Sequence, residues 1–335
     1  MNTQKNKIVG IVCFLLLLGT VMLSLMLGSY SMTPKEVIQT ILGNGNKLQN
    51  FTIFQIRLPR IALAIIVASA LSISGGILQG ITRNPLAEPG MIGINAGAAL
   101  FVVFWISSGT TAYYSALSFS TIIWMPVVAI TGSLLSVLVI CLFAYKKGIR
   151  PVRFLLTGVG VNAGITAIIS FYQLNMSKGD YNQVLTWTNG SLWGSTWNYI
   201  LLTFPLITVL ILLVLFRSKI LDVLGLGDEL AFGLGVSVQK EMLFFLICSA
   251  LLSAIATSVA GNIAFLGLLG PQIAKRIVGP VHRTMLPFAA GISAIILILA
   301  DTAARNLFSP LEIPVGIVVS ILGVPYFIYL MLKGK

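Results

Sequence analysis

Ten apolar segments constrain this chain more than any other feature of its sequence. A helix of about 20 apolar residues crosses the roughly 30 Å hydrocarbon core of a bilayer, where backbone groups must be satisfied within the segment. Only 9% of the residues are charged, against about 25% in soluble domains. We therefore expect an all-α polytopic membrane protein of about ten transmembrane helices, forming one domain over residues 1–335. The expected spans are 8–28, 58–80, 91–107, 122–144, 152–173, 198–216, 241–260, 262–273, 285–303 and 312–332.

Lysine and arginine residues in the connections predict how the chain lies in the membrane. With the N-terminus in the cytoplasm, 15 of the 21 basic residues fall on the inner side of the alternating spans. Inner loops are enriched in lysine and arginine, so both termini are expected in the cytoplasm. The net charge of +12 follows mostly from this bias, and it gives no reason to expect nucleic-acid binding.

The residues needed for chemistry are scarce. The sequence has no GxxxxGK[ST] phosphate loop, no HExxH motif and a single histidine, His282. Its three cysteines lie in apolar runs without metal or redox spacing, so no catalytic residue, cofactor or metal site is predicted. Among acids within the spans only Asp301 is a candidate, and Arg305 follows it one helical turn later as its expected partner. This scarcity also disfavours an ion-coupled secondary carrier and a membrane-embedded enzyme.

Small residues recur at helical spacing. Glycines four residues apart lie on one helix face and let backbones approach closely, so we expect tight packing there. Asn95 and Asn162 lie within two of these motifs, and a buried amide must find partners. We favour hydrogen bonds across helices for both, with the lining of a polar path as the alternative. The residues concerned are Gly76, Gly80, Gly93, Asn95, Gly97, Gly160, Asn162 and Gly164.

Two features at the membrane surfaces each allow two interpretations. Arg57, Arg60 and Arg305 lie at the outer ends of spans, where they either anchor the helices at the interface or form a docking site for an acidic partner. Residues 217–240 lie inside and are too charged and glycine-rich to span. They form either a linker or a small helix that faces a cytoplasmic partner. The tryptophans of TWTNGSLWGSTW at 186–197 suit an interfacial aromatic belt.

Four stretches resemble the FecCD-type permeases, the membrane subunits of ATP-binding-cassette (ABC) importers for iron chelates and cobalamin. They are RLPR at 57–60, ISGGILQGITRNPLAEPGMIGINAGA at 73–98, GNIAFLGLLGPQIAKRIVGPVHR at 261–283 and LADTAARNLFSPLEIPVGIVVSILGVPYFIYLML at 299–332. The match runs through nearly the whole chain in order. One departure is Pro271-Gln272, where many relatives carry Pro-His.

The resemblance implies a type II ABC importer permease fold in the cytoplasmic membrane of a bacterium. It also implies a second permease subunit, identical or homologous, with cytoplasmic ATP-binding subunits and an extracytoplasmic substrate-binding protein. The implied cargo is an iron(III)-siderophore, with cobalamin or haem as the alternative. Docking becomes the favoured role of the three arginines. Residues 221–238 match the family's inner loop of two short helices, which implies ATPase coupling through Gly225, Gly227, Asp228, Glu229, Leu230, Ala231 and Gly235.

The stretch from Arg83 to Gly90 is expected to be a tight cytoplasmic turn. Pro85 and Pro89 should end one helix and start the next, because proline is tolerated in the first turn of a helix but not in its interior. Glu88, together with the asparagine after Arg83, is expected to tie this turn to neighbouring backbone.

Overall fold

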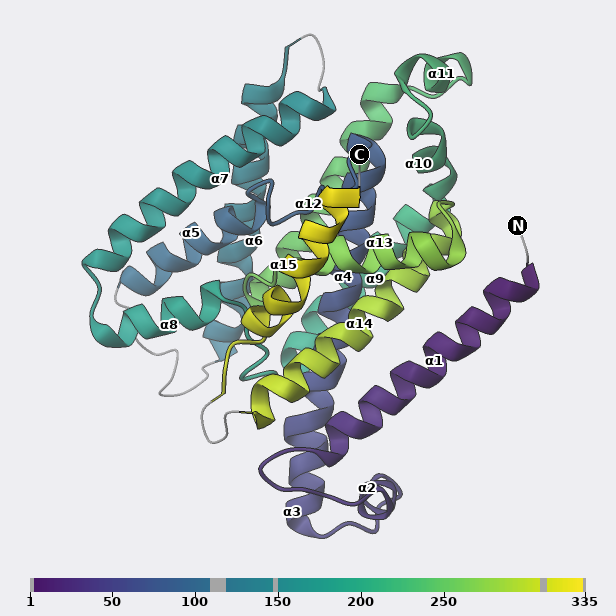
Figure 1. The fold of residues 1–335 in the computed structure, drawn as a ribbon. Helices are drawn as coiled ribbons and strands as arrows, with labels where there is room; N and C mark the ends of the chain where they lie inside the picture. Colours follow the sequence, from purple (N-terminus) through teal and green to yellow (C-terminus); the bar gives the residue numbers. More distant parts are fainter. Residues whose placement is uncertain (1–2, 109–118, 147–149, 308–311, 334–335) are drawn as a thin grey trace.

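The computed structural model describes residues 3–108, 119–146, 150–307 and 312–333. The fold of these residues consists of long and short helices (Figure 1). Within these ranges, eight helices are long and apolar enough to cross a membrane, and two shorter ones of 14 and 13 residues complete the ten expected places. These ten are α1 (Thr3–Met26), α4 (Leu58–Thr82), α5 (Ile94–Ser107), α6 (Phe119–Ala144), α7 (Pro151–Leu174), α9 (Trp197–Phe216), α12 (Val238–Ala260), α13 (Leu266–Val278), α14 (His282–Asn306) and α15 (Val315–Lys333).

Short helices lie at both ends of the bundle. α2 (Pro34–Ile41), α3 (Lys47–Asn50) and the π-helix η1 (Phe51–Arg57) precede α4 at one end, and α10 (Ser218–Leu224) and α11 (Asp228–Gly233) lie at the opposite end (Figure 1). Both chain termini lie toward the end with α10 and α11. Thr33 begins α2 with a capping box, and hydrogen bonds from its amide and hydroxyl lower the pKa of the Glu36 carboxyl.

Like α2, α3 and η1, one further helix was not expected from the sequence. α8 (Lys178–Thr188) begins where the Ser177 hydroxyl accepts a hydrogen bond from the Asp180 amide. Its last turn buries Trp187 in an apolar cluster with α5 and α6, so this tryptophan packs inside the protein instead of joining an interfacial belt. Trp193 and Trp197 remain exposed.

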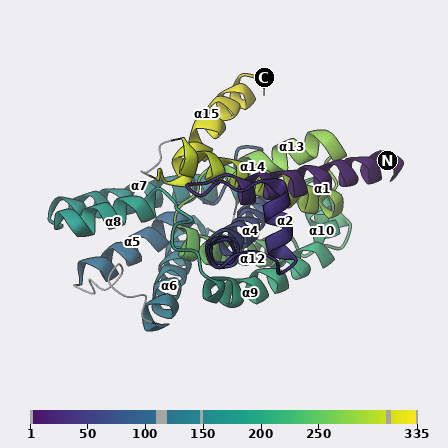
Figure 2. The same ribbon diagram turned by 90° about the horizontal axis from the view of Figure 1, so that it is seen from below.

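α4 is the central helix, with α12 beside it in the view from below (Figure 2). It packs against α12, α13 and α14, and nearly all of its 25 residues are buried. The closest approach is to α13, where a Cβ on Gly75 would lie 1.9 Å from the Gly267 carbonyl oxygen. Because real Cβ contacts stay beyond 3.0 Å, only glycine fits there.

The glycine motifs have different surroundings. A Cβ on Gly97 would lie 2.4 Å from the Gly132 carbonyl oxygen of α6, and one on Gly76 would lie 2.6 Å from the Leu286 side chain. Both are therefore packing positions, like Gly80 and Gly93.

The motif on α7 differs from the expectation of tight packing. A Cβ on Gly160 or Gly164 would meet nothing within 4 Å among the described residues, because α7 turns this face away from the rest of the chain. Asn162 lies against Gly93. The side-chain amide of Asn162 makes no hydrogen bond within the described part of the chain.

Candidate functional site

Two helices begin inside the bundle. At 1.5 Å per residue, α5 and α13 each extend about 20 Å, which is less than the roughly 30 Å hydrocarbon core. The first turns of both helices are buried, so we infer that the backbone before them, residues 83–93 and 261–265, reaches into the depth of the membrane. Non-helical backbone is tolerated there only where it is buried in protein or lines a cavity. This region is accordingly the first place to look for a transport path.

A chain of side-chain hydrogen bonds joins the two helix starts. The Ser253 hydroxyl of α12 donates to Asn95 Oδ1 at 2.7 Å, and Asn95 Nδ2 donates to Asn262 Oδ1 at 2.9 Å. Asn95 is 1% exposed and thus forms the cross-helix bond that its sequence context favoured. The buried Glu88 carboxylate accepts from the Phe265 amide at 3.0 Å, so it ties the two non-helical segments together.

Three glycines form a backbone junction beside this chain. The Ser191 amide donates to the Ala260 carbonyl at 2.9 Å, and the Gly316 amide donates to the Gly190 carbonyl at 3.2 Å. A Cβ on Gly261 would lie 2.1 Å from the Trp187 carbonyl oxygen. Added to Gly316, a Cβ would lie 2.0 Å from the carbonyl oxygen of Asn189. Sequence reasoning missed this junction, because its members lie far apart and belong to no glycine repeat.

A cavity of about 580 Å³ opens at this junction, and we refer to it as the junction pocket. It lies between the end of α8, residues 262–264 and the first half of α15. Amides and hydroxyls supply its polar groups, and no charged side chain is among the described residues that line it. The lining consists of Thr188, Asn189, Asn262, Ala264, Gly316, Ile317, Ser320, Ile321, Val324 and Pro325.

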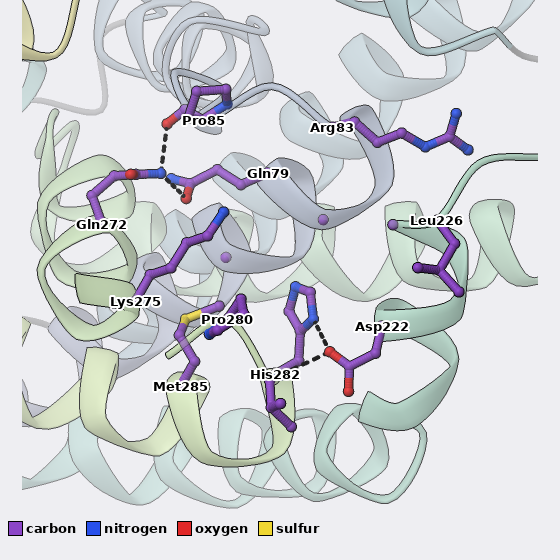
Figure 3. A pocket seen from close by; sticks show the side chains of 14 residues that line it. Gln79, Arg83, Pro85, Asp222, Leu226, Gln272, Lys275, Pro280, His282 and Met285 are labelled. Atoms are coloured by element: carbon purple, nitrogen blue, oxygen red, sulfur yellow. Dashed lines mark hydrogen bonds and ion pairs between the residues drawn. The ribbon is translucent and has the colours of Figure 1, made fainter. Parts of the chain in front are cut away.

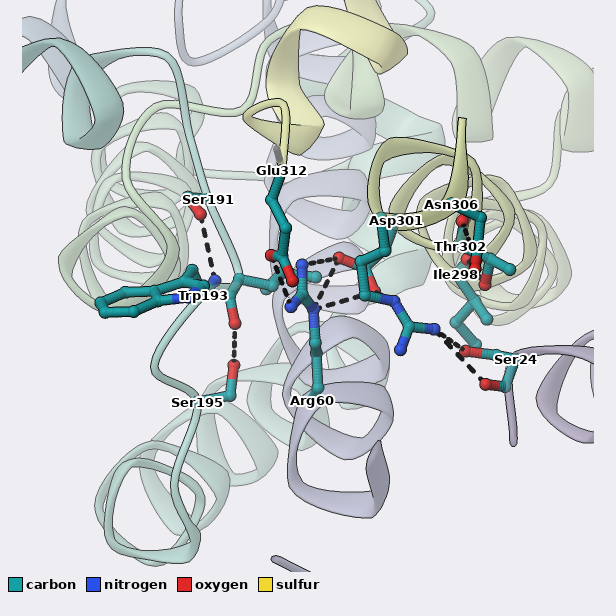
Figure 4. Close-up of polar contacts among 12 residues, drawn as sticks. Ser24, Arg60, Ser191, Trp193, Ser195, Ile298, Asp301, Thr302, Asn306 and Glu312 are labelled. Atoms are coloured by element: carbon teal, nitrogen blue, oxygen red, sulfur yellow. Dashed lines mark hydrogen bonds and ion pairs between the residues drawn. The ribbon is translucent and has the colours of Figure 1, made fainter. Parts of the chain in front are cut away.

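At the end with α2 and α3, two of the expected docking arginines, Arg57 and Arg60, are buried, and Arg305 is half-buried. Arg60 is 8% exposed and lies between Asp301, at 2.9 Å, and Glu312, at 3.0 Å (Figure 4). Arg305 contacts Asp301 at 3.3 Å, as their spacing predicted. Arg57 donates to the backbone carbonyl of Leu25, in the last turn of α1, and to that of Tyr30, between α1 and α2. The guanidinium groups are thus engaged within their own chain and are not free at the surface.

At the opposite end, charged contacts hold the segment of α10 and α11. Arg83, at the end of α4, donates to the Leu224 carbonyl at 3.0 Å and forms an ion pair with Asp228. His282 begins α14, and its ring nitrogen Nδ1 lies 2.6 Å from Asp222, which also accepts from the His282 backbone amide (Figure 3). These side chains line a second cavity of about 510 Å³.

Gln272, the departure noted in the sequence, also lines this second cavity. Its amide donates to the Pro85 carbonyl at 3.0 Å and to Gln79 at 2.8 Å (Figure 3). The Gln272 side-chain amide thus links α13 to the turn after α4. Unlike a histidine at this position, it has no titratable group.

The segment of α10 and α11 has two distinct faces. Leu221, Leu224 and Ala231 are buried against the bundle. The opposite face is apolar and exposed, which marks it as an interaction surface for a protein or a membrane. Its residues are Leu226, Leu230, Phe232 and Leu234, each at least 58% exposed.

A polytopic helical bundle with short inner helices, an uncharged pocket at their start and an exposed apolar loop defines a membrane permease. The FecCD transport family model matches residues 15–333, and the chain belongs to this family. It is 43% identical over its full length to the iron(3+)-hydroxamate import system permease protein FhuG of Bacillus subtilis, which is covered completely as well.

Further relatives and a solved structure agree with this assignment. The Bacillus subtilis iron-uptake system permease protein FeuC is 37% identical, with 93% of each chain covered. The Fe(3+) dicitrate transport system permease protein FecD of Escherichia coli is 33% identical, with 96% of this chain and 97% of that protein covered. A metal-chelate type ABC transporter in an inward-facing conformation matches with a TM-score of 0.84 at 29% identity, over 96% of this chain and 98% of the other.

Proposed function

We propose that this chain is the permease subunit of an ABC importer that moves an iron(III)-siderophore across the cytoplasmic membrane of a bacterium. Membership of the FecCD family carries this proposal. The functions of the relatives, which include iron(3+)-hydroxamate and Fe(3+) dicitrate import, support an iron chelate over cobalamin or haem. The whole of residues 1–335 acts as one transmembrane domain with no ATPase site of its own.

Energy enters through residues 221–238, which we assign as the coupling segment. Its exposed apolar face suits a cytoplasmic ATP-binding subunit, and its buried face and charged contacts fix it to α4 and α14. ATP binding and hydrolysis can favour one conformation only through contacts that differ between the inward and outward states. In this proposal the coupling segment supplies such contacts, and α10, α11 and both chain termini are expected in the cytoplasm.

The substrate-binding protein docks at the end with α2 and α3, near Arg57, Arg60 and Arg305. The buried position of Arg60 defines how this contact forms. The Glu312 side chain, which covers Arg60, is 38% exposed, so a carboxylate of the binding protein can replace it on the guanidinium group. Such charge pairs set the orientation of docking more than its affinity.

Iron uptake in a deletion strain tests the proposed function. Radioactive iron is offered with one siderophore at a time, and labelled cobalamin serves as the control. Loss of uptake for one class of iron chelate, restored by the intact gene, is the expected result. Loss of cobalamin uptake alone would retain the importer mechanism and replace the cargo, and a strain that keeps all of these activities would refute the proposal.

A further inference from the structure

We propose that the junction pocket is a contact site for the translocated chelate and that it selects chelates without net charge. The inference rests on the proposed function, because it names the substrate class of the same transport path. The pocket has the volume of a small-molecule site, for which about 300–1,000 Å³ is typical. It also lies where the short helix α13 begins, and discontinuous helices form the binding sites of many transporters.

The hydrogen-bond chain that ends at the pocket determines how the side-chain amide of Asn262 is oriented. Because Asn262 Oδ1 accepts from Asn95, which in turn accepts from Ser253, the Asn262 Nδ2 group is left as the free end. This nitrogen has no partner within the described residues, and Asn262 lines the pocket. The two N–H groups are therefore available to a ligand, with Asn95 and Ser253 as positioning residues.

The other polar groups of the pocket are partly used within their own helices. The Thr188 hydroxyl donates to the Val184 carbonyl at 2.8 Å, and the Ser320 hydroxyl donates to the Gly316 carbonyl at 2.8 Å. Asn189 uses one N–H on the Leu185 carbonyl. The donors left for a ligand are thus amide N–H groups, whose complement is an oxygen acceptor.

Charge decides which oxygen-rich chelates fit. The chain has 30 acidic and basic side chains in total, yet none is among the described residues that line the pocket. Moving an anion from water into a pocket with such a lining costs free energy, because no positive charge replaces the hydration that the anion loses. Three hydroxamate groups carry three negative charges and neutralise iron(III). A citrate complex retains surplus carboxylates and is therefore an anion.

Equilibrium dialysis of the assembled importer in lipid nanodiscs, without binding protein, tests the pocket directly. The probes are iron-55 as the neutral trihydroxamate ferrichrome and as iron(III) dicitrate. The test variant is Asn262→Asp, because aspartate still accepts from Asn95 but loses the free N–H donors and places one negative charge in the pocket. Asn182→Asp is the matched control, since Asn182 is exposed on α8 and outside the junction pocket.

We expect ferrichrome to bind the wild type and the Asn182→Asp variant equally, and the Asn262→Asp variant about tenfold more weakly. Dicitrate should bind the wild type at least tenfold more weakly than ferrichrome. Equal binding of the two chelates, no detectable binding of ferrichrome, or an unaffected Asn262→Asp variant would overturn the inference. Uptake with the binding protein present, measured in parallel, tests the proposed function separately, because iron uptake can persist when the pocket assignment fails.

Discussion

Two nearly identical pentapeptides give a sharp test of the packing described above. GINAG at 93–97 and GVNAG at 160–164 differ at one residue, yet Gly97 and Gly164 have opposite surroundings. A Cβ on Gly97 would lie 2.4 Å from the Gly132 carbonyl oxygen, whereas one on Gly164 would meet nothing within 4 Å. Replacing each glycine with alanine therefore makes the same chemical change in two different environments.

The structure sets the size of the expected effect. Ordinary contacts of a Cβ begin at 3.4 Å, so Gly97→Ala requires α5 and α6 to separate by about 1 Å. The shift would also strain the Ser136 hydroxyl, which donates to the Gly93 carbonyl at 2.8 Å. Overpacking of this kind costs about 1–3 kcal/mol. Gly164→Ala should instead stabilise α7 by about 0.5–1 kcal/mol, because alanine loses less backbone entropy than glycine in a helix.

Unfolding of the purified permease in mixed micelles, titrated with sodium dodecyl sulfate and followed by tryptophan fluorescence, measures both changes. The unfolding free energy of Gly97→Ala should fall below that of Gly164→Ala by about 1.5–4 kcal/mol. Equal free energies for the two variants, or a larger loss for Gly164→Ala, would refute the packing argument.

Four other variants test the remaining proposals. Asp228→Lys together with Glu229→Lys should abolish chelate-stimulated ATP hydrolysis while the permease stays in the membrane; normal stimulation would contradict the coupling assignment. Glu312→Gln should tighten docking of the binding protein severalfold by uncovering Arg60, and Arg60→Glu should weaken it, as measured by surface plasmon resonance; the reverse order would exclude the exchange at Arg60. Gly261→Ala should lower the unfolding temperature by several degrees, since its Cβ meets the backbone at 2.1 Å; an unchanged temperature would show that the junction is not tightly packed.

Some features of the candidate site were visible in the sequence. The Asp301–Arg305 contact followed from their spacing of one helical turn, and Asn95 was recognised because an amide within an apolar run must find partners. The turn at 83–90 was recognised from its prolines. Its tie through Glu88 was expected as well, although the partner, the Phe265 amide, came only from the structure.

Other features required the tertiary structure. The three junction glycines lie on segments more than 50 residues apart, so no local pattern connects them. From the sequence, Arg60 is expected to be a surface residue at the end of a span. Only the structure shows that α14 and the residues before α15 pack against α4 and enclose Arg60 with two carboxylates. The free end of Asn262 depends on a hydrogen-bond chain through two other helices.

The ten helices and their order were determined by the sequence alone, because a run of apolar residues in lipid must satisfy its backbone within itself. The direction in which each helix faces was decided by the tertiary structure. A helix that is apolar on every side carries no pattern to distinguish the lipid-facing side from the protein-facing side. For this reason GINAG and GVNAG, which are almost the same in sequence, have different surroundings in the structure. The first packs closely against a neighbouring helix, and the second lies on an open face.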